Sequence, residues 1–157
     1  MKLKKIAGVA ACGLAVLTAS TFALPRHVSV ERSALLNASP EAILALAASN
    51  EGYQAFNPYR SMDPALTIEP FGPSSGVGSG FHFSGKDGTG HQTVAAVTSD
   101  RVSYDVDLGP LGQPKQFIST QALPQGAQVT WRLEADMGFN PVFRVMGLFM
   151  DSMVGPT

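Results

Sequence analysis

Two segments in the second half of the chain alternate strictly between apolar and polar residues, and this pattern limits the fold more than any other feature. Residues 101–108 and 127–136 are each expected to form a strand with apolar side chains along one face. These side chains are Val102, Tyr104, Val106 and Leu108 in the first segment and Val129, Trp131, Leu133 and Ala135 in the second. Because successive side chains of a strand point to opposite faces, the pattern predicts a sheet with one buried and one solvated face.

Further strands are expected over residues 28–36, 66–71, 81–84, 92–98 and 115–123. The Asp-Gly step within Lys86–Thr89 predicts a hairpin turn of those four residues. That turn would pair Ser84 with His91 and make His82 and His91 diagonal neighbours. Alternation then assigns Phe81, Phe83, Val94 and Ala96 to the interior face.

Helices are expected on either side of this run of strands. Ser39 and Pro40 have the residue types of an N-cap and a first helical position, and they predict a helix to about residue 48 with a short turn over 50–56 behind it. Asn140 and Pro141 similarly predict a helix over 141–154, which is apolar on nearly every side. A strand, a helix pair, about six strands and a final helix predict an α+β fold.

The first 25 residues read as a targeting segment. Three lysines at positions 2, 4 and 5 precede an uncharged run from Ile6 to Ala23, which is the pattern of a signal peptide cleaved after Ala23. Residues 6–24 also suffice for an N-terminal membrane anchor. Both interpretations make residues 26–157 an exported domain, periplasmic or otherwise extracytoplasmic, secreted or attached to the membrane. The only cysteine of the chain, Cys12, lies in the targeting segment, so residues 26–157 cannot form a disulfide among themselves.

Composition excludes two other classes of protein. Hydrophobic residues make up 45% and charged residues 15% of the chain, which is typical of a globular domain rather than a disordered one. The formal net charge is −1, so the chain lacks the excess of basic residues that is typical of nucleic-acid-binding proteins.

Several short motifs resemble those of one known family. They are Val28–Ser33, Ala38–Glu41, Tyr53-Gln-Ala-Phe-Asn-Pro-Tyr59, Gly76-Val-Gly-Ser-Gly80, Val129-Thr-Trp131, Asp136–Pro141 and Gly147–Pro156. Over about residues 28–156 the chain resembles the START-like (SRPBCC) superfamily, in its polyketide cyclase/dehydrase-like branch. It departs from the family in having Tyr53 and Phe56 where tryptophan is common.

This resemblance implies a helix-grip fold. In that fold a curved antiparallel sheet of about seven strands has a helix pair after its first strand, and a long C-terminal helix lies against the concave face. A cavity between sheet and helix holds an apolar ligand. The family's helix continues for several turns past the Gly-Pro, whereas here it is cut short at Thr157, which would leave apolar surface for self-association or for a partner protein.

The candidate site residues follow from the inferred interior face and from the resemblance. They are Arg32, Phe81, Phe83, Tyr104, Trp131, Met146 and Met150. We interpret the domain as a binding module for a small apolar or lipid-like ligand. The alternatives are a polyketide cyclase/dehydrase-type enzyme, for which Tyr104 and Arg32 are the only acid or base candidates, and an envelope module that binds proteins through its apolar helix.

Two other patterns favour structural roles. His82 and His91 share a face, but it is opposite Phe81 and Phe83, and no third ligand has suitable spacing, so we expect no metal and no cofactor. Gly76–Gly80 is not followed by Gly-Lys-Ser/Thr and leads into a strand, which favours a connecting loop over a phosphate-binding loop.

Overall fold

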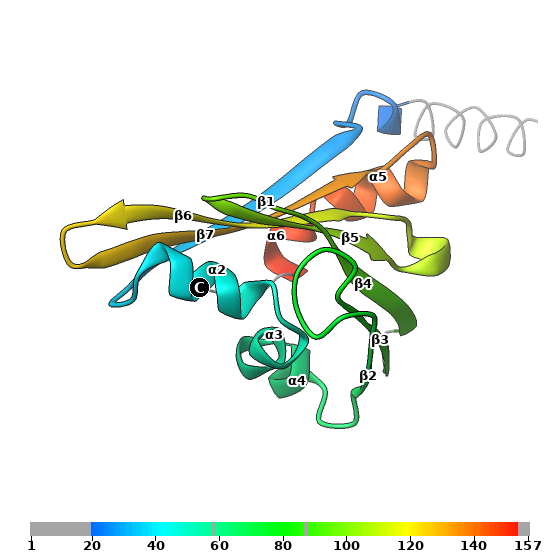
Figure 1. Ribbon diagram of the computed structural model, residues 1–157. Helices are drawn as coiled ribbons and strands as arrows, with labels where there is room; N and C mark the ends of the chain where they lie inside the picture. The colour runs from blue at the N-terminus through cyan, green and yellow to red at the C-terminus, as the bar shows by residue number, and fades with distance from the viewer. Residues whose placement is uncertain (1–19, 58, 87, 154–157) are drawn as a thin grey trace, which may run out of the picture. The chain divides into compact units, whose positions relative to one another are not determined.

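The computed structural model describes residues 20–57, 59–86 and 88–153 (Figure 1). The chain divides into two compact units, which we describe separately. The sheet unit comprises residues 29–135, and the terminal unit comprises the described parts of segments 1–28 and 136–156. The predicted targeting features of residues 1–19, including Cys12 and the three lysines, lie outside the described residues. No helix within the described ranges is long and apolar enough to cross a membrane.

A seven-stranded sheet with antiparallel neighbours along β2 to β7 confirms the predicted α+β architecture. Its spatial order is β1-β7-β6-β5-β4-β3-β2, and it curves around the helices of the sheet unit (Figure 1). The strands are β1 (His27–Leu36), β2 (Thr67–Phe71), β3 (Gly80–Gly85), β4 (Gly88–Val97), β5 (Arg101–Asp107), β6 (Lys115–Leu123) and β7 (Gly126–Asp136).

The two faces of the sheet differ as the alternation predicts. The face that carries the core, which we call the inner face, includes Val102, Tyr104 and Ile118, each at most 3% exposed. The opposite, outer face is polar and carries ion pairs between Arg132 and both Glu31 and Glu134. One-sided burial therefore fixes the register, because a slip of one residue would turn every core side chain outward.

Three short helices lie between β1 and β2: α2 (Pro40–Ala47), α3 (Asn50–Phe56) and α4 (Tyr59–Met62). The Ser39 side chain accepts a hydrogen bond from the Ala42 amide, which confirms its predicted role as N-cap. The Ser49 hydroxyl caps α3 in the same way through the Gly52 amide. Helix α2 packs on β5 and β6, so Leu44 and Ala47 complete the core. Helix α4 was not predicted.

The β3–β4 hairpin is tighter than the sequence predicted. Gly85 pairs with Gly88, so the paired positions are closer in sequence than predicted, and Ser84 pairs with Thr89 instead of His91. Gly88 has a φ of +131°, a conformation that glycine adopts without steric cost. This register places His82 directly opposite His91, not diagonal to it.

A β-bulge in β4 corrects a second expectation. Val94 pairs with Tyr104 while Ala96 pairs with Ser103, so the register shifts between them. The extra residue reverses the facing of the strand end. Ala96 is therefore exposed on the outer face, whereas Val94 stays in the core at 4% exposure.

The terminal unit contains a helix that is interrupted, where one continuous helix was predicted. Helix α5 covers Pro141–Gly147 and α6 covers Met150–Met153, and Asn140 caps α5 by accepting from the Val142 amide. Between them, Leu148 and Phe149 donate to carbonyls three residues earlier rather than four. Such tightened bonds end an α-helical turn.

The chain before β1 is bound within this terminal unit. The buried Arg144 guanidinium donates to the carbonyl oxygens of Phe22 at 2.8 Å, Leu24 at 3.0 Å and Gly138 at 3.0 Å. Arg26 forms a two-pronged ion pair with Asp136, at 2.7 and 2.8 Å. The Arg26 guanidinium holds the pKa of the Asp136 carboxyl well below its usual range.

Candidate functional site

Four of the predicted site residues share the inner face of the sheet. Phe81 and Tyr104 are buried in the core cluster, and Phe83 and Trp131 are partly buried against it. The register explains the shared face, because directly paired residues point to the same side of a sheet. Val94 of β4 pairs with Tyr104 of β5, and Ile118 of β6 pairs with Trp131 of β7. The inner face thus has a sealed aromatic centre with a half-buried aromatic side chain on either side of it, Phe83 on β3 and Trp131 on β7. We call these two flanks the aromatic margin.

Tyr53 of α3 connects this aromatic centre to a polar network that sequence reasoning did not identify. Its ring lies 5.4 Å from Phe81 and 5.5 Å from Tyr104, between ring centroids. Its hydroxyl accepts a hydrogen bond from Gln116 Nε2 at 2.9 Å and also bonds with Gln92. Burial raises the pKa of Tyr53 to about 12. Both glutamines occupy inner-face positions, so the alternation was the signal that could have revealed them.

The two acid or base candidates are both hydrogen-bonded to backbone carbonyls. Tyr104 donates from its hydroxyl to the Ala47 carbonyl at 2.7 Å, and burial raises the pKa of this phenol. Arg32 shares the inward parity of Val30 and donates from its guanidinium to the Glu31 carbonyl. Two carboxylates near the end of β7 pair with other arginines, Glu134 with Arg132 and Asp136 with Arg26.

Space within this aromatic centre is small. A cavity of about 10 Å³ lies between α2, α3 and strands β3 to β5. It is bordered by Tyr53, Gln92 and Tyr104, and by Ser79, whose buried hydroxyl has no hydrogen-bond partner among the described groups. This volume suits about one water molecule and no lipid. The sealed centre therefore has no room for a molecule of lipid size.

Met146 and Met150 are not brought into the same cluster. Met146 lies in α5 and Met150 begins α6, so both belong to the terminal unit. Their role as pocket residues stays a prediction.

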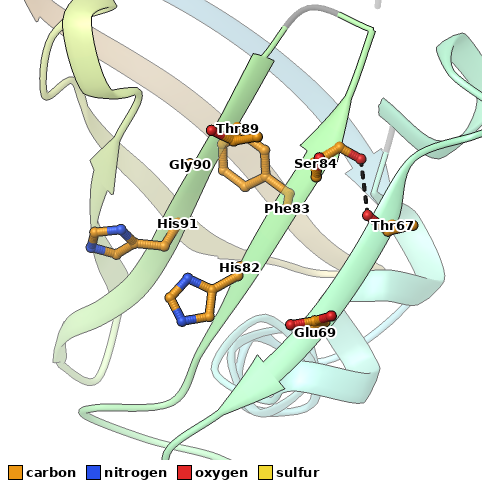
Figure 2. Close-up of a pocket in the computed structure, with 8 residues that line it drawn as sticks. All are labelled: Thr67, Glu69, His82, Phe83, Ser84, Thr89, Gly90 and His91. Atoms are coloured by element: carbon orange, nitrogen blue, oxygen red, sulfur yellow. Dashed lines mark hydrogen bonds between the residues drawn. The ribbon is translucent and has the colours of Figure 1, made fainter.

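A larger hollow, of about 360 Å³, lies along the first hairpins of the sheet (Figure 2). Most of its lining comes from outer-face side chains: Thr67, Glu69, His82, Ser84, Thr89 and His91, joined by Phe83 and Gly90. The sequence placed both histidines on the solvent side, and the structure confirms that face. It does not confirm their predicted diagonal spacing, as described above.

With the fold and these surfaces established, comparison with known proteins identifies the class. Residues 27–157 match the family described as "Polyketide cyclase / dehydrase and lipid transport". The chain belongs to this family, within the START-like (SRPBCC) superfamily to which its sequence motifs pointed. No curated protein matches the chain.

Solved structures share the fold at low sequence identity. Protein CV1439 from Chromobacterium violaceum is 14% identical with a TM-score of 0.54, and the match covers 82% of this chain and 98% of that one. The protein of unknown function SA2116 from Staphylococcus aureus is also 14% identical, with a TM-score of 0.57 and coverage of 82% and 85%. The di-domain ARO/CYC StfQ of the steffimycin biosynthetic pathway is 14% identical with a TM-score of 0.53, covering 81% of this chain and 47% of StfQ.

Proposed function

We propose that this domain binds a small apolar or lipid-like molecule against the inner face of its sheet. The observation that carries the proposal is the half-buried aromatic margin, in which Phe83 on β3 and Trp131 on β7 flank the buried core from its two sides. Small-molecule sites combine apolar and aromatic walls with a few polar groups. The family description, which includes lipid transport, supports the same ligand class.

An enzyme of the cyclase or dehydrase type is the alternative that the family description also covers. General acid or base catalysis requires a titratable group within reach of the substrate. Tyr104 is buried with its hydroxyl bonded to a carbonyl, which favours a structural role for this residue. We therefore favour the binding module over the enzyme.

Native mass spectrometry of the chain purified from its own host tests this proposal. We expect an extra mass of a small apolar molecule that is lost in Phe83→Ala. The matched control is Phe117→Ala, because Phe117 is also half-buried but lies on the outer face, where the Arg101 guanidinium covers its ring. Retention of the extra mass in Phe83→Ala, or its loss in Phe117→Ala alone, would place the ligand elsewhere. Turnover of the recovered molecule would favour the enzyme.

We further propose that the domain acts outside the cytoplasm. The support is the N-terminal sequence, in which three lysines precede the uncharged run from Ile6 to Ala23. Cell fractionation should recover the domain in the extracytoplasmic fraction, either free or attached to the membrane through residues 6–24. Recovery of the full-length chain in the soluble cytoplasmic fraction would contradict this location.

A further inference from the structure

A row of four titratable side chains crosses the outer face of the sheet. The register places Glu69 of β2 opposite His82 of β3, His82 opposite His91 of β4, and His91 opposite Asp107 of β5. Directly opposed residues of antiparallel strands have Cβ atoms only about 4.5–5.5 Å apart. The two imidazoles are therefore neighbours, with a carboxylate beyond each of them.

Neither imidazole is held by a hydrogen bond within the part of the chain that the structure describes. Within residues 20–57, 59–86 and 88–153, no hydrogen bond or ion pair involves the His82 or His91 ring. Both rings instead line the hollow of about 360 Å³, and Figure 2 shows them side by side on adjacent strands. Phe71 lies 4.7 Å from the His82 ring and 6.3 Å from the His91 ring, between centroids, and so supports the pair.

The spacing of the rings suits a shared metal ion. Their centroids are 5.8 Å apart and their planes are inclined by 61°. With a metal–nitrogen bond of about 2.0–2.1 Å, the centroids of two imidazoles on one ion lie at most about 6.4 Å apart. The observed separation is within that limit, and rotation of the side chains can bring a nitrogen of each ring to the ion.

Contrary to the expectation of no metal drawn from the sequence, we propose that His82 and His91 form an outer-face site for a divalent transition-metal ion, with two protein ligands and open positions for water or a small exogenous ligand. Among the described residues, no group of three His, Cys, Asp or Glu side chains could hold a metal ion. The proposed site therefore has only the two histidines as protein ligands. Imidazole suits copper, nickel and zinc, and copper(II) binds most tightly among these.

The flanking carboxylates add to this arrangement. Metal-bound imidazoles commonly donate their second N–H to a carboxylate, which orients the ring. Asp107 is already held in place, because its Oδ1 accepts from the Gly109 amide at 2.7 Å and its Oδ2 accepts from Gln113 at 3.1 Å. Asp107, which interacts electrostatically with His91, is thus a positioning residue of the proposed site and not a ligand.

Titration of the full chain with copper(II) tests the site, in a Cys12→Ser background that removes the only thiol. We expect one ion per chain by calorimetry and, by electron paramagnetic resonance, splitting from two imidazole nitrogens. His82→Ala and His91→Ala should each weaken binding by more than about 10-fold, the lower end of the loss seen for outer-shell residues. Asp107→Asn should weaken it by about 10-fold and keep both nitrogens.

The third histidine, His27, provides the matched control, because it lies in the terminal unit. His27→Ala should bind copper as the parent chain does. A zinc titration followed by imidazole ¹⁵N NMR needs no ligand variant and should shift His82 and His91 but not His27. Unchanged His82 and His91 resonances, or undiminished copper binding by the folded alanine variants, would overturn the proposal.

Discussion

At the scale of single residues, the Tyr104 hydroxyl links the sheet to α2. It is 2% exposed, and its hydrogen bond to the Ala47 carbonyl satisfies a polar group inside the core. Removing one partner of a buried hydrogen bond leaves the other desolvated and unpaired. This residue therefore contributes to the fold more directly than to catalysis.

Tyr104→Phe should lower the free energy of unfolding by about 1–3 kcal/mol, because the Ala47 carbonyl loses its donor. Urea unfolding measures this change. Tyr59→Phe is the matched control, since Tyr59 is 42% exposed, and it should change stability by no more than about 0.5 kcal/mol. Equal effects of the two substitutions would contradict the assigned role.

Arg144 has the corresponding role in the terminal unit. Arg144→Lys should loosen the chain around Phe22 and Leu24, because an ammonium group cannot match the planar guanidinium that reaches three carbonyls. Hydrogen exchange of residues 21–26 should accelerate. Arg26→Lys is the control and should affect exchange less, since exposed ion pairs contribute only about 0–1 kcal/mol. Faster exchange in Arg26→Lys than in Arg144→Lys would count against the assignment.

At the scale of elements, the β6–β7 hairpin depends on Gly126. Its φ is +125°, and a Cβ there would collide with the carbonyl oxygen of Leu36 at the end of β1. A glycine is therefore required both for the backbone conformation and for the close approach of β1.

Gly126→Ala should destabilise the protein more than Gly112→Ala does. Gly112 has a similar φ of +109° but open space around its Cβ position, so it reports the conformational cost alone, about 1–3 kcal/mol. The difference between the two variants in thermal or urea unfolding measures the collision with Leu36. Equal destabilisation would mean that β1 does not approach Gly126 so closely.

The elements also show where sequence reasoning succeeded and where it failed. Alternation located β5 and β7 correctly because one buried face dictates side-chain parity along a whole strand. It failed at Ala96, where a bulge inserts one residue without any local signal in composition. The predicted cross-strand partner of His82 was also wrong, because the Asp-Gly step is compatible with a turn of two residues or of four.

The candidate site was predictable to the same extent. The inner-face placement of Phe81, Phe83, Tyr104 and Trp131 was predicted because they share the inward parity, while their contact with a ligand stays a prediction. Gln92 and Gln116 were missed because their polarity argued against a core position, although Tyr53 satisfies them there. The opposed pair of His82 and His91 required the register, which the sequence left ambiguous.

At the scale of the whole molecule, the buried tyrosines make stability depend on alkaline pH. Burial raises the pKa of Tyr53 to about 12 and raises that of Tyr104 as well, against about 10 for an unfolded tyrosine. The folded state thus retains protons that the unfolded state releases. This contribution is fully present below about pH 10 and is lost as the pH rises towards about 12.

Unfolding free energy should therefore fall by up to about 1.4 kcal/mol per pH unit for each buried tyrosine above about pH 10. Urea unfolding at a series of alkaline pH values measures the slope. Tyr53→Phe should reduce the slope even though it removes the hydrogen-bond partner of Gln116. An unfolding free energy that does not change over this interval would show that the phenols are accessible to solvent in the folded chain.

The central claim is that the inner face of the sheet, at its half-buried aromatic margin, is the surface that binds an apolar ligand. Trp131 is the only tryptophan of the chain and lies on that margin, so its fluorescence reports on this surface directly. Titration with a long-chain fatty alcohol or a polycyclic aromatic compound should shift Trp131 emission saturably, with weaker binding in Phe83→Ala and unchanged binding in Phe117→Ala. Calorimetric binding of the same compounds with no change in Trp131 emission would contradict the claim.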